Sequence, residues 1–88
     1  MMELTVKIEN KAGLHARPAA MFAKKTSSFK STIMIVKGDK SVNAKSIIGI
    51  MGLGIKQGES LRLKIEGPDA EEAAVALGEL VANKFGVE

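Results

Sequence analysis

Strict alternation of apolar and polar side chains in two short segments constrains the fold of this chain more than any other feature. In residues 3–8 and again in residues 61–66, an apolar side chain occupies every second position and a polar or charged one stands between. Successive side chains point to opposite faces of a strand, so each segment predicts a strand with one buried and one solvated face. Such strands need a second layer on one face of their sheet.

A hairpin is predicted between these two strands. Residues 32–37 are rich in β-branched side chains, and Gly38 and Asp39 separate them from residues 40–43. A two-residue connection that contains glycine is typical of a tight turn between antiparallel strands. The chain is therefore expected to contain four strands.

Two of the predicted helices lie between these strands. From Ala16 onward, the apolar spacing of a helix with one buried face is met by Ala19, Phe22, Ala23 and Thr26. Residues 46–54 are apolar but interrupted by glycines, which predicts only about two helical turns. Ser46 is the expected N-cap of that short helix, and Gly52 or Gly54 is expected to end it.

A third helix is predicted at the end of the chain. Asp69 follows Pro68 as the expected N-cap, and Glu72 three residues later would complete a capping box. Gly86 is expected to close this helix. The predicted order is β-α-β-β-α-β-α, which indicates an α+β fold with helices on one face of the sheet. The 88 residues fit one domain, residues 1–88.

Composition excludes several classes of function. The chain has no cysteine and one histidine, so disulfides, a cysteine nucleophile and a protein metal site are not expected. Its 13 basic and 10 acidic residues are interspersed and form no nucleic-acid arm, although the net charge of +3 favours acidic partners. With no signal peptide and no long apolar run, we expect a cytoplasmic protein without membrane insertion.

The only histidine lies in the segment GLHARPAA, residues 13–20, at the predicted junction of strand and helix. A lone histidine at this place is most simply a cap or a surface residue. The neighbours Gly13, Arg17 and Pro18 favour a functional interpretation instead. A helix start stabilises an anion beside Ala16 and Arg17 by about 0.3 to 2 kcal/mol, and the Arg17 guanidinium fits phosphate oxygens. Pro18 falls in the first turn of this helix, where the missing N–H of proline costs no helical hydrogen bond.

Together with the later segment SVNAKSIIGIMGLGIKQG, this motif resembles the histidine-containing phosphocarrier (HPr) family over essentially the whole chain. The resemblance implies an open-faced sandwich of a four-stranded antiparallel sheet covered by three helices. It also implies that His15 accepts a phosphoryl group on Nδ1 from enzyme I of the sugar phosphotransferase system and passes it to EIIA domains. No cofactor is expected, and the chain would be a monomeric carrier rather than an enzyme.

Ser46 has a second interpretation beside that of an N-cap worth about 1 kcal/mol. In relatives with a similar sequence around this serine, an HPr kinase/phosphorylase phosphorylates it, and the product binds a catabolite-control transcription factor. By resemblance, Ser46 is therefore a candidate site of regulatory phosphorylation. An alternative function is that of an HPr-like regulator that acts mainly through Ser46, although the intact motif around His15 favours a carrier.

A docking surface is predicted beside His15. The short helix has more apolar residues than one buried face needs, and Met21 projects away from the core stripe of the first helix. Isolated surface methionine and a wholly buried short helix would be the simpler explanation. We expect instead one partner-binding patch with a basic rim of Arg17, Lys24, Lys45 and Lys40. The residues assigned to partner binding are Ala20, Met21, Lys24, Ile47, Ile48 and Met51.

An RNA-binding alternative rests on residues 48–55, which fit the I-G-x-x-G-x-x-I pattern of KH domains. The two variable positions hold Ile50 and Met51, where a loop facing phosphate needs small or basic residues. The chain also lacks an aromatic platform for bases. Direct nucleic-acid binding is therefore not expected.

Overall fold

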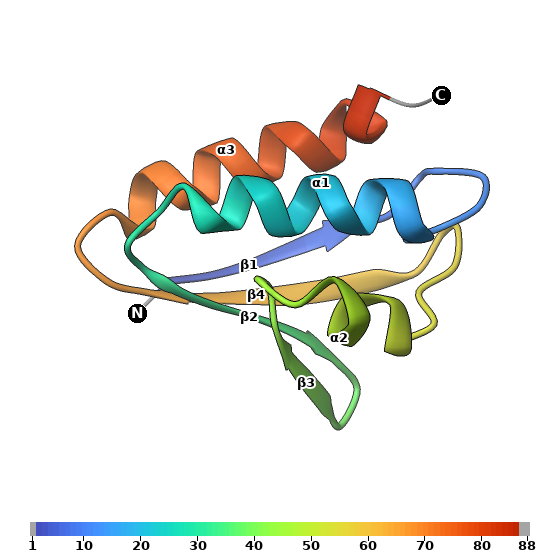
Figure 1. Ribbon diagram of the computed structural model, residues 1–88, viewed down its shortest axis with the longest axis horizontal. Helices are drawn as coiled ribbons and strands as arrows, with labels where there is room; N and C mark the ends of the chain where they lie inside the picture. The colour runs from blue at the N-terminus through green and yellow to red at the C-terminus, as the bar shows by residue number, and fades with distance from the viewer. Residues whose placement is uncertain (1, 87–88) are drawn as a thin grey trace.

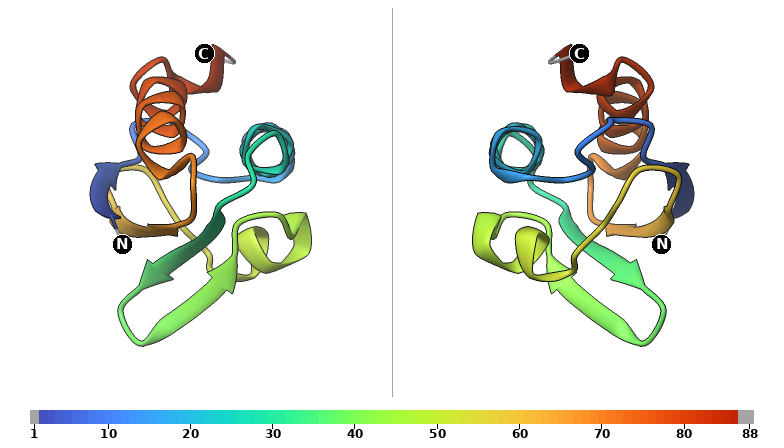
Figure 2. Two further views of the ribbon diagram at one scale, coloured as in Figure 1. Left: turned by 90° about the vertical axis from the view of Figure 1, so that its left-hand side faces the viewer. Right: turned by 90° about the vertical axis from the view of Figure 1, so that its right-hand side faces the viewer.

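The computed structural model describes residues 2–86 and has the predicted order of elements. Figure 1 shows β1 (Met2–Lys7), α1 (Ala16–Ser27), β2 (Thr32–Lys37), β3 (Lys40–Asn43), α2 (Ile47–Gly52), β4 (Ser60–Glu66), α3 (Ala70–Ala82) and a final 3-10 turn, η1 (Lys84–Gly86). The strands form one antiparallel sheet in the order β1-β4-β2-β3. Helices α1, α2 and α3 lie on one face of it (Figure 2). The prediction of an α+β open-faced sandwich is confirmed.

The register of the strands places the alternating apolar residues in one layer. Leu63 of β4 lies between Leu4 of β1 and Ile35 of β2. Leu63 and Ile35 are completely buried, whereas Arg62, the residue before Leu63, is exposed. Each large aliphatic side chain buried in this way contributes about 1.5 to 3 kcal/mol relative to an exposed one. The sheet and helices thus share one core, made of aliphatic side chains together with Phe22 and Phe85.

Helix α1 packs on this core through the face predicted from its spacing. Its buried residues are Pro18, Ala19, Phe22, Ala23 and Thr26. The β2–β3 hairpin also has the predicted turn, with Gly38 at φ 61° and Lys37 paired with Lys40. Both local patterns were sufficient to identify these elements.

The capping box predicted at the start of α3 is wrong. Asp69 occupies the N-cap position, but its side chain makes no capping hydrogen bond. Instead the carboxylate accepts hydrogen bonds from the Ser31 hydroxyl at 2.5 Å and from the amides of Lys30 and Ser31 at 2.8 and 2.9 Å. These bonds, the Ser31 hydroxyl first, hold the pKa of Asp69 below its usual value. Donors from a neighbouring loop therefore take the place of the α3 amides that a local cap would have used.

The predicted end of α3 at Gly86 is also wrong, because the helix ends at Ala82. Lys84 and Phe85 follow with left-handed backbone angles, φ 52° and 58°. Such a conformation costs a residue other than glycine about 1 to 2 kcal/mol. The Phe85 ring is buried against Phe22 of α1, with ring centroids 6.2 Å apart. Burial of this ring offsets the backbone strain.

Candidate functional site

His15 is the N-cap residue of α1. Its backbone is extended, with φ −80° and ψ −170°, and its carbonyl oxygen accepts the first helical hydrogen bond from Ala19 at 3.0 Å. The imidazole makes no capping hydrogen bond and is exposed to solvent. The backbone alone therefore starts the helix, and both ring nitrogens remain available to a reaction partner.

Unpaired hydrogen-bond donors surround the start of α1. Among residues 2–86, the amides of Ala16 and Arg17 make no hydrogen bond, and Pro18 has no N–H to pair. No ion pair within those residues engages the exposed Arg17 guanidinium. The positive end of the helix dipole and this free cation can stabilise a dianionic group on His15.

The turn that carries His15 is held against the segment before β4. Gly13 has φ 68°, and its amide donates to the Asn10 carbonyl at 2.9 Å. The amide of the buried Leu14 donates to the Ile55 carbonyl at 3.1 Å. A Cβ on Gly13 would lie 2.2 Å from the same Ile55 oxygen, so only glycine allows this approach. Gly13 thus has a direct structural role in the motif.

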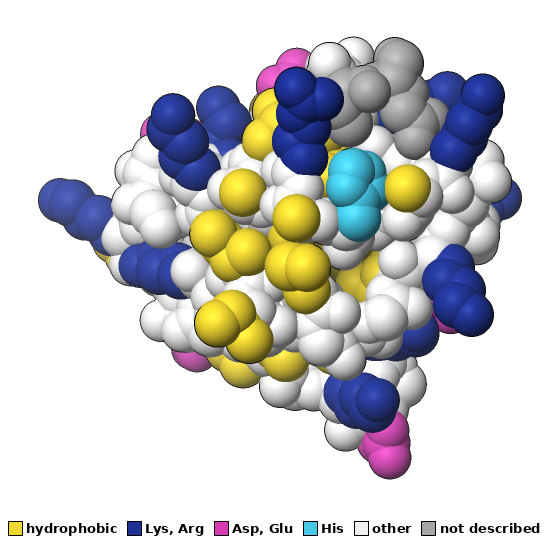
Figure 3. All heavy atoms as spheres, turned by 45° about the vertical axis from the view of Figure 1, so that its right-hand side comes forward, with side chains coloured by type: hydrophobic (Ala, Val, Ile, Leu, Met, Phe, Trp, Pro, Cys, Tyr) yellow, Lys and Arg dark blue, Asp and Glu magenta, His cyan; other side chains and the backbone are white. Residues whose placement is uncertain are grey.

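Apolar side chains are exposed beside His15. Ile47, Ile48 and Met51 of α2 are 42 %, 85 % and 44 % exposed, so a wholly buried short helix is excluded. Helix α2 contacts α1, where Ala20 and Met21 are half-buried and Lys24 is exposed. Figure 3 shows the histidine next to a group of apolar side chains, with Lys and Arg side chains at its edge. The structure therefore brings the predicted partner-binding patch together, while its role in binding stays a prediction.

Ser46 caps α2 as predicted. Its hydroxyl accepts a hydrogen bond from the Gly49 amide at 3.0 Å, and the residue is exposed. The other end of α2 has a support that the sequence did not reveal. Lys37 of β2 donates to the carbonyl oxygens of Leu53 and Gly54 at 3.2 and 3.3 Å, where a cation compensates the helix dipole.

Lys37 is in turn held by Glu59. Their side chains form an ion pair at 3.2 Å, and the Glu59 carboxylate also accepts from the Lys56 amide at 2.6 Å. The Lys56 amide, followed by Lys37, lowers the pKa of Glu59. This contact network connects the end of α2 to the segment that supports the His15 turn.

Comparison with known proteins identifies the family. The family described as PTS HPr component phosphorylation site matches residues 2–83 of the chain. The chain belongs to the HPr family. As a member of this family it is a phosphocarrier rather than an independent catalyst.

Relatives match the chain along its length. It is 46 % identical to phosphocarrier protein HPr of Treponema pallidum, over all of both chains. It is 48 % identical over 77 residues to the HPr-like protein Crh of Halalkalibacterium halodurans, covering 88 % of this chain and 92 % of that one. The crystal structure of HPr-C-His from Thermoanaerobacter tengcongensis superimposes with a TM-score of 0.95 at 55 % identity, covering 100 % and 99 % of the two chains. The crystal structure of an HPr dimer from that organism superimposes with a TM-score of 0.78 at 55 % identity, covering 98 % of this chain and 99 % of that one.

Other features of this HPr-family chain limit the alternatives. The I-G-x-x-G pattern begins inside α2 rather than in a loop between helices, so it does not present a KH-type backbone clamp. Within residues 2–86, no three acidic, histidine or cysteine side chains are grouped as a metal site requires. None of the helices in that range is long and apolar enough to cross a bilayer.

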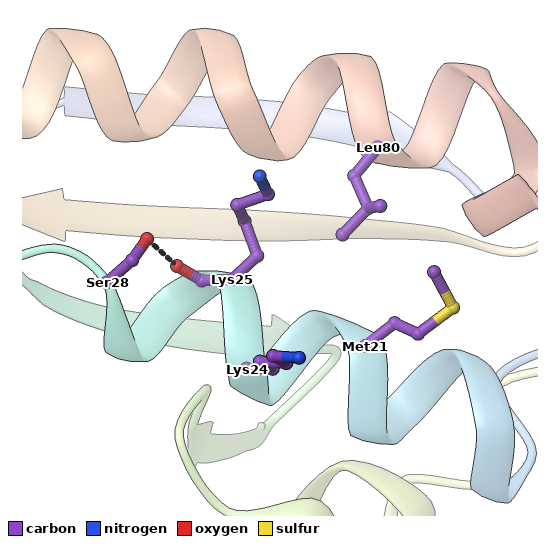
Figure 4. A pocket seen from close by; sticks show the side chains of 5 residues that line it. All are labelled: Met21, Lys24, Lys25, Ser28 and Leu80. Atoms are coloured by element: carbon purple, nitrogen blue, oxygen red, sulfur yellow. Dashed lines mark hydrogen bonds between the residues drawn. The ribbon is translucent and has the colours of Figure 1, made fainter.

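A hollow of about 420 Å³ lies between α1 and α3. Figure 4 shows Leu80 of α3 pointing toward α1 across this hollow. Met21 and Lys24 belong to both the hollow and the partner-binding patch, and the hollow is lined by Met21, Lys24, Lys25, Ser28 and Leu80. His15 does not line this hollow and is exposed on the surface.

Proposed function

We propose that this chain accepts a phosphoryl group on His15 from phospho-enzyme I of the sugar phosphotransferase system and donates it to EIIA domains of sugar transporters. The observation that carries the proposal is the exposed imidazole at the start of α1, which makes no capping bond and lies beside two amides without a hydrogen bond to any of residues 2–86. The lone pair of a neutral ring nitrogen attacks phosphorus, and the bond from phosphorus to the donor breaks with its electrons left on the donor. Donation to EIIA reverses these steps.

The start of α1 supplies the stabilisation for the phosphorylated form. The amides of Ala16 and Arg17 are free to bind phosphoryl oxygens, and the helix dipole contributes about 0.3 to 2 kcal/mol. Arg17 acts on the charge that develops on the phosphoryl group during transfer. The exposed site leaves room for donor and acceptor proteins to approach His15 in turn.

Enzyme I and the EIIA domains dock on the partner-binding patch. The exposed Ile48 offers apolar area, and Arg17, Lys24 and Lys45 provide a basic rim that favours acidic partner surfaces. The carrier works as a cytoplasmic monomer. Sedimentation at working concentration tests the monomer directly, since a related HPr forms a dimer.

Ser46 is the regulatory site in this proposal. Its exposed hydroxyl is open to an HPr kinase/phosphorylase, and its phosphorylated form presents a dianion to a catabolite-control transcription factor. The similarity to the HPr-like protein Crh favours a second candidate, a regulator that acts mainly through Ser46. The intact GLHARP segment around His15 favours the carrier.

The test is incubation with phosphoenolpyruvate and enzyme I, followed by the intact mass. The wild-type chain should gain one acid-labile phosphoryl group, and His15→Ala should gain none while keeping its circular dichroism spectrum. Acid-labile phosphate on His15→Ala would contradict the proposal. Ile48→Ala should raise the KM for enzyme I, whereas its control, Val75→Ala on the exposed face of α3, should not.

A further inference from the structure

Asn10 is a buried polar residue in the segment between β1 and His15. It has no exposed surface, and its Nδ2 donates to the Lys84 carbonyl oxygen at 2.9 Å. Within residues 2–86 its Oδ1 has no hydrogen-bond partner. An unpaired buried acceptor destabilises the fold, so the structural contribution of this amide must come from the Nδ2 bond.

The acceptor of this bond lies in a turn that a buried side chain holds in place. Lys84 belongs to η1, where it and Phe85 have left-handed backbone angles. The Phe85 ring is buried against Phe22 of α1, which prevents the turn from relaxing. Figure 1 shows η1 and the β1–α1 loop at the same end of the molecule. The Asn10 side chain therefore connects the β1–α1 loop to η1, which lies 74 positions later in the sequence.

The same residue also begins the turn that carries His15. The Asn10 carbonyl oxygen accepts from the Gly13 amide at 2.9 Å, and the next amide, that of Leu14, donates to Ile55. The side chain of Asn10 thus fixes one end of the turn, while Ile55 fixes the other. These two attachments position the His15 backbone, because only Leu14 separates His15 from Gly13.

We propose that Asn10 is a positioning residue for phosphoryl transfer, which holds the turn so that the imidazole stays at the start of α1. This inference rests on the proposed function of His15. Asn10 has no exposed surface to offer a docking partner, so its loss should affect the reacting geometry more than docking. Small displacements of a reacting group reduce the rate of transfer strongly.

The experiment compares Asn10→Ala with Ser31→Ala. Ser31 is equally buried and loses a hydrogen bond to Asp69, but it lies beyond the opposite end of α1. The steady-state rate of acceptance from phospho-enzyme I is measured over a range of carrier concentrations, well below the unfolding temperature of each variant. Asn10→Ala should lower kcat about tenfold and change KM less than about twofold, whereas Ser31→Ala should change neither.

Amide hydrogen exchange gives a readout that does not depend on phosphoryl transfer. The amides of Gly13 and Leu14 should exchange about tenfold faster in Asn10→Ala than in the wild-type chain, and Ser31→Ala should leave them unchanged. Asn10→Asp provides a second variant of the same shape, for the case in which Asn10→Ala does not fold. The carboxyl group that this variant introduces can donate to the Lys84 carbonyl oxygen only when it is protonated, and burial raises the pKa of such an acid. Protection of the Gly13 and Leu14 amides should therefore fall as the pH rises through that pKa.

The outcomes separate the two proposals. A wild-type chain that takes no phosphoryl group contradicts the proposed function of His15. Unchanged kcat in Asn10→Ala, or unchanged exchange at Gly13 and Leu14, overturns the role of Asn10 alone. The role of Asn10 is also overturned if the protection of the Gly13 and Leu14 amides in Asn10→Asp, divided by that in the wild-type chain at the same pH, does not change with pH.

Discussion

Gly13→Ala should destabilise the chain far more than a glycine substitution usually does. Two effects act at this position. A left-handed backbone at φ 68° costs alanine about 1 to 2 kcal/mol. The new Cβ would also lie 2.2 Å from the Ile55 carbonyl oxygen and 2.9 Å from the Lys56 Cα, both backbone atoms that cannot rotate away. Forced displacement of packed groups costs about 1 to 3 kcal/mol more.

The expected loss is therefore about 2 to 5 kcal/mol, out of about 5 to 10 kcal/mol for a domain of this size. Gly54→Ala is the matched control. Gly54 has nearly the same backbone angle, φ 62°, but a Cβ there would meet no atom within 4 Å. This control should lose only the cost of the left-handed conformation, about 1 to 2 kcal/mol.

Urea unfolding followed by circular dichroism measures both variants against the wild-type chain. The prediction concerns the difference between them, because the cost of the backbone angle cancels. Gly13→Ala should be less stable than Gly54→Ala by at least about 1 kcal/mol, with similar m-values. Equal losses would show that the turn before His15 is not held against Ile55 as described.

Three further predictions follow from the site and its supports. Arg17→Ala should lower kcat for acceptance about ten- to a hundredfold with little change in KM, and a loss recovered at saturating concentration would count against this role. Asp69 has a pKa lowered from 3.8 by hydrogen bonds from Ser31 and Lys30, so its contribution to stability is present above that value and is lost as the pH falls through the folded-state pKa. In Asp69→Asn, the urea midpoint should therefore fall less at acid pH than it does in the wild-type chain. The same dependence of the midpoint on pH in both chains would contradict this role of Asp69. Phosphorylation of Ser46, which Ser46→Asp mimics imperfectly, should keep or raise the thermal midpoint, because a negative charge suits the start of α2. The phosphate dianion should nevertheless weaken enzyme I binding about a hundredfold at low salt. Reduced stability or equal binding at low salt would refute that account.

Local signals predicted most of the fold. Alternation identified β1 and β4, and the cap at Ser46 is confirmed by its bond to Gly49. The GLHARP segment placed His15 at the start of a helix, where the structure has it. Each of these features depends on residues within a few positions of one another, so a pattern in the sequence carries the information.

Features that depend on distant residues were missed. Asp69 has the sequence of an N-cap, but donors from a loop 38 and 39 positions away bind its carboxylate. Lys84 and Phe85 are left-handed without glycine, a conformation that only the burial of Phe85 makes acceptable. Asn10 resembles an ordinary turn residue until the fold brings Lys84 to it.

Onward transfer from the isolated phosphorylated chain tests the central claim most directly. The chain is loaded with phosphoenolpyruvate and enzyme I, separated from both, and mixed with an equimolar EIIA domain. The account predicts that phosphate leaves His15 and appears on EIIA at the same rate and in equal amount. Phosphate that is only hydrolysed from His15, with none reaching any EIIA domain, would contradict a carrier role.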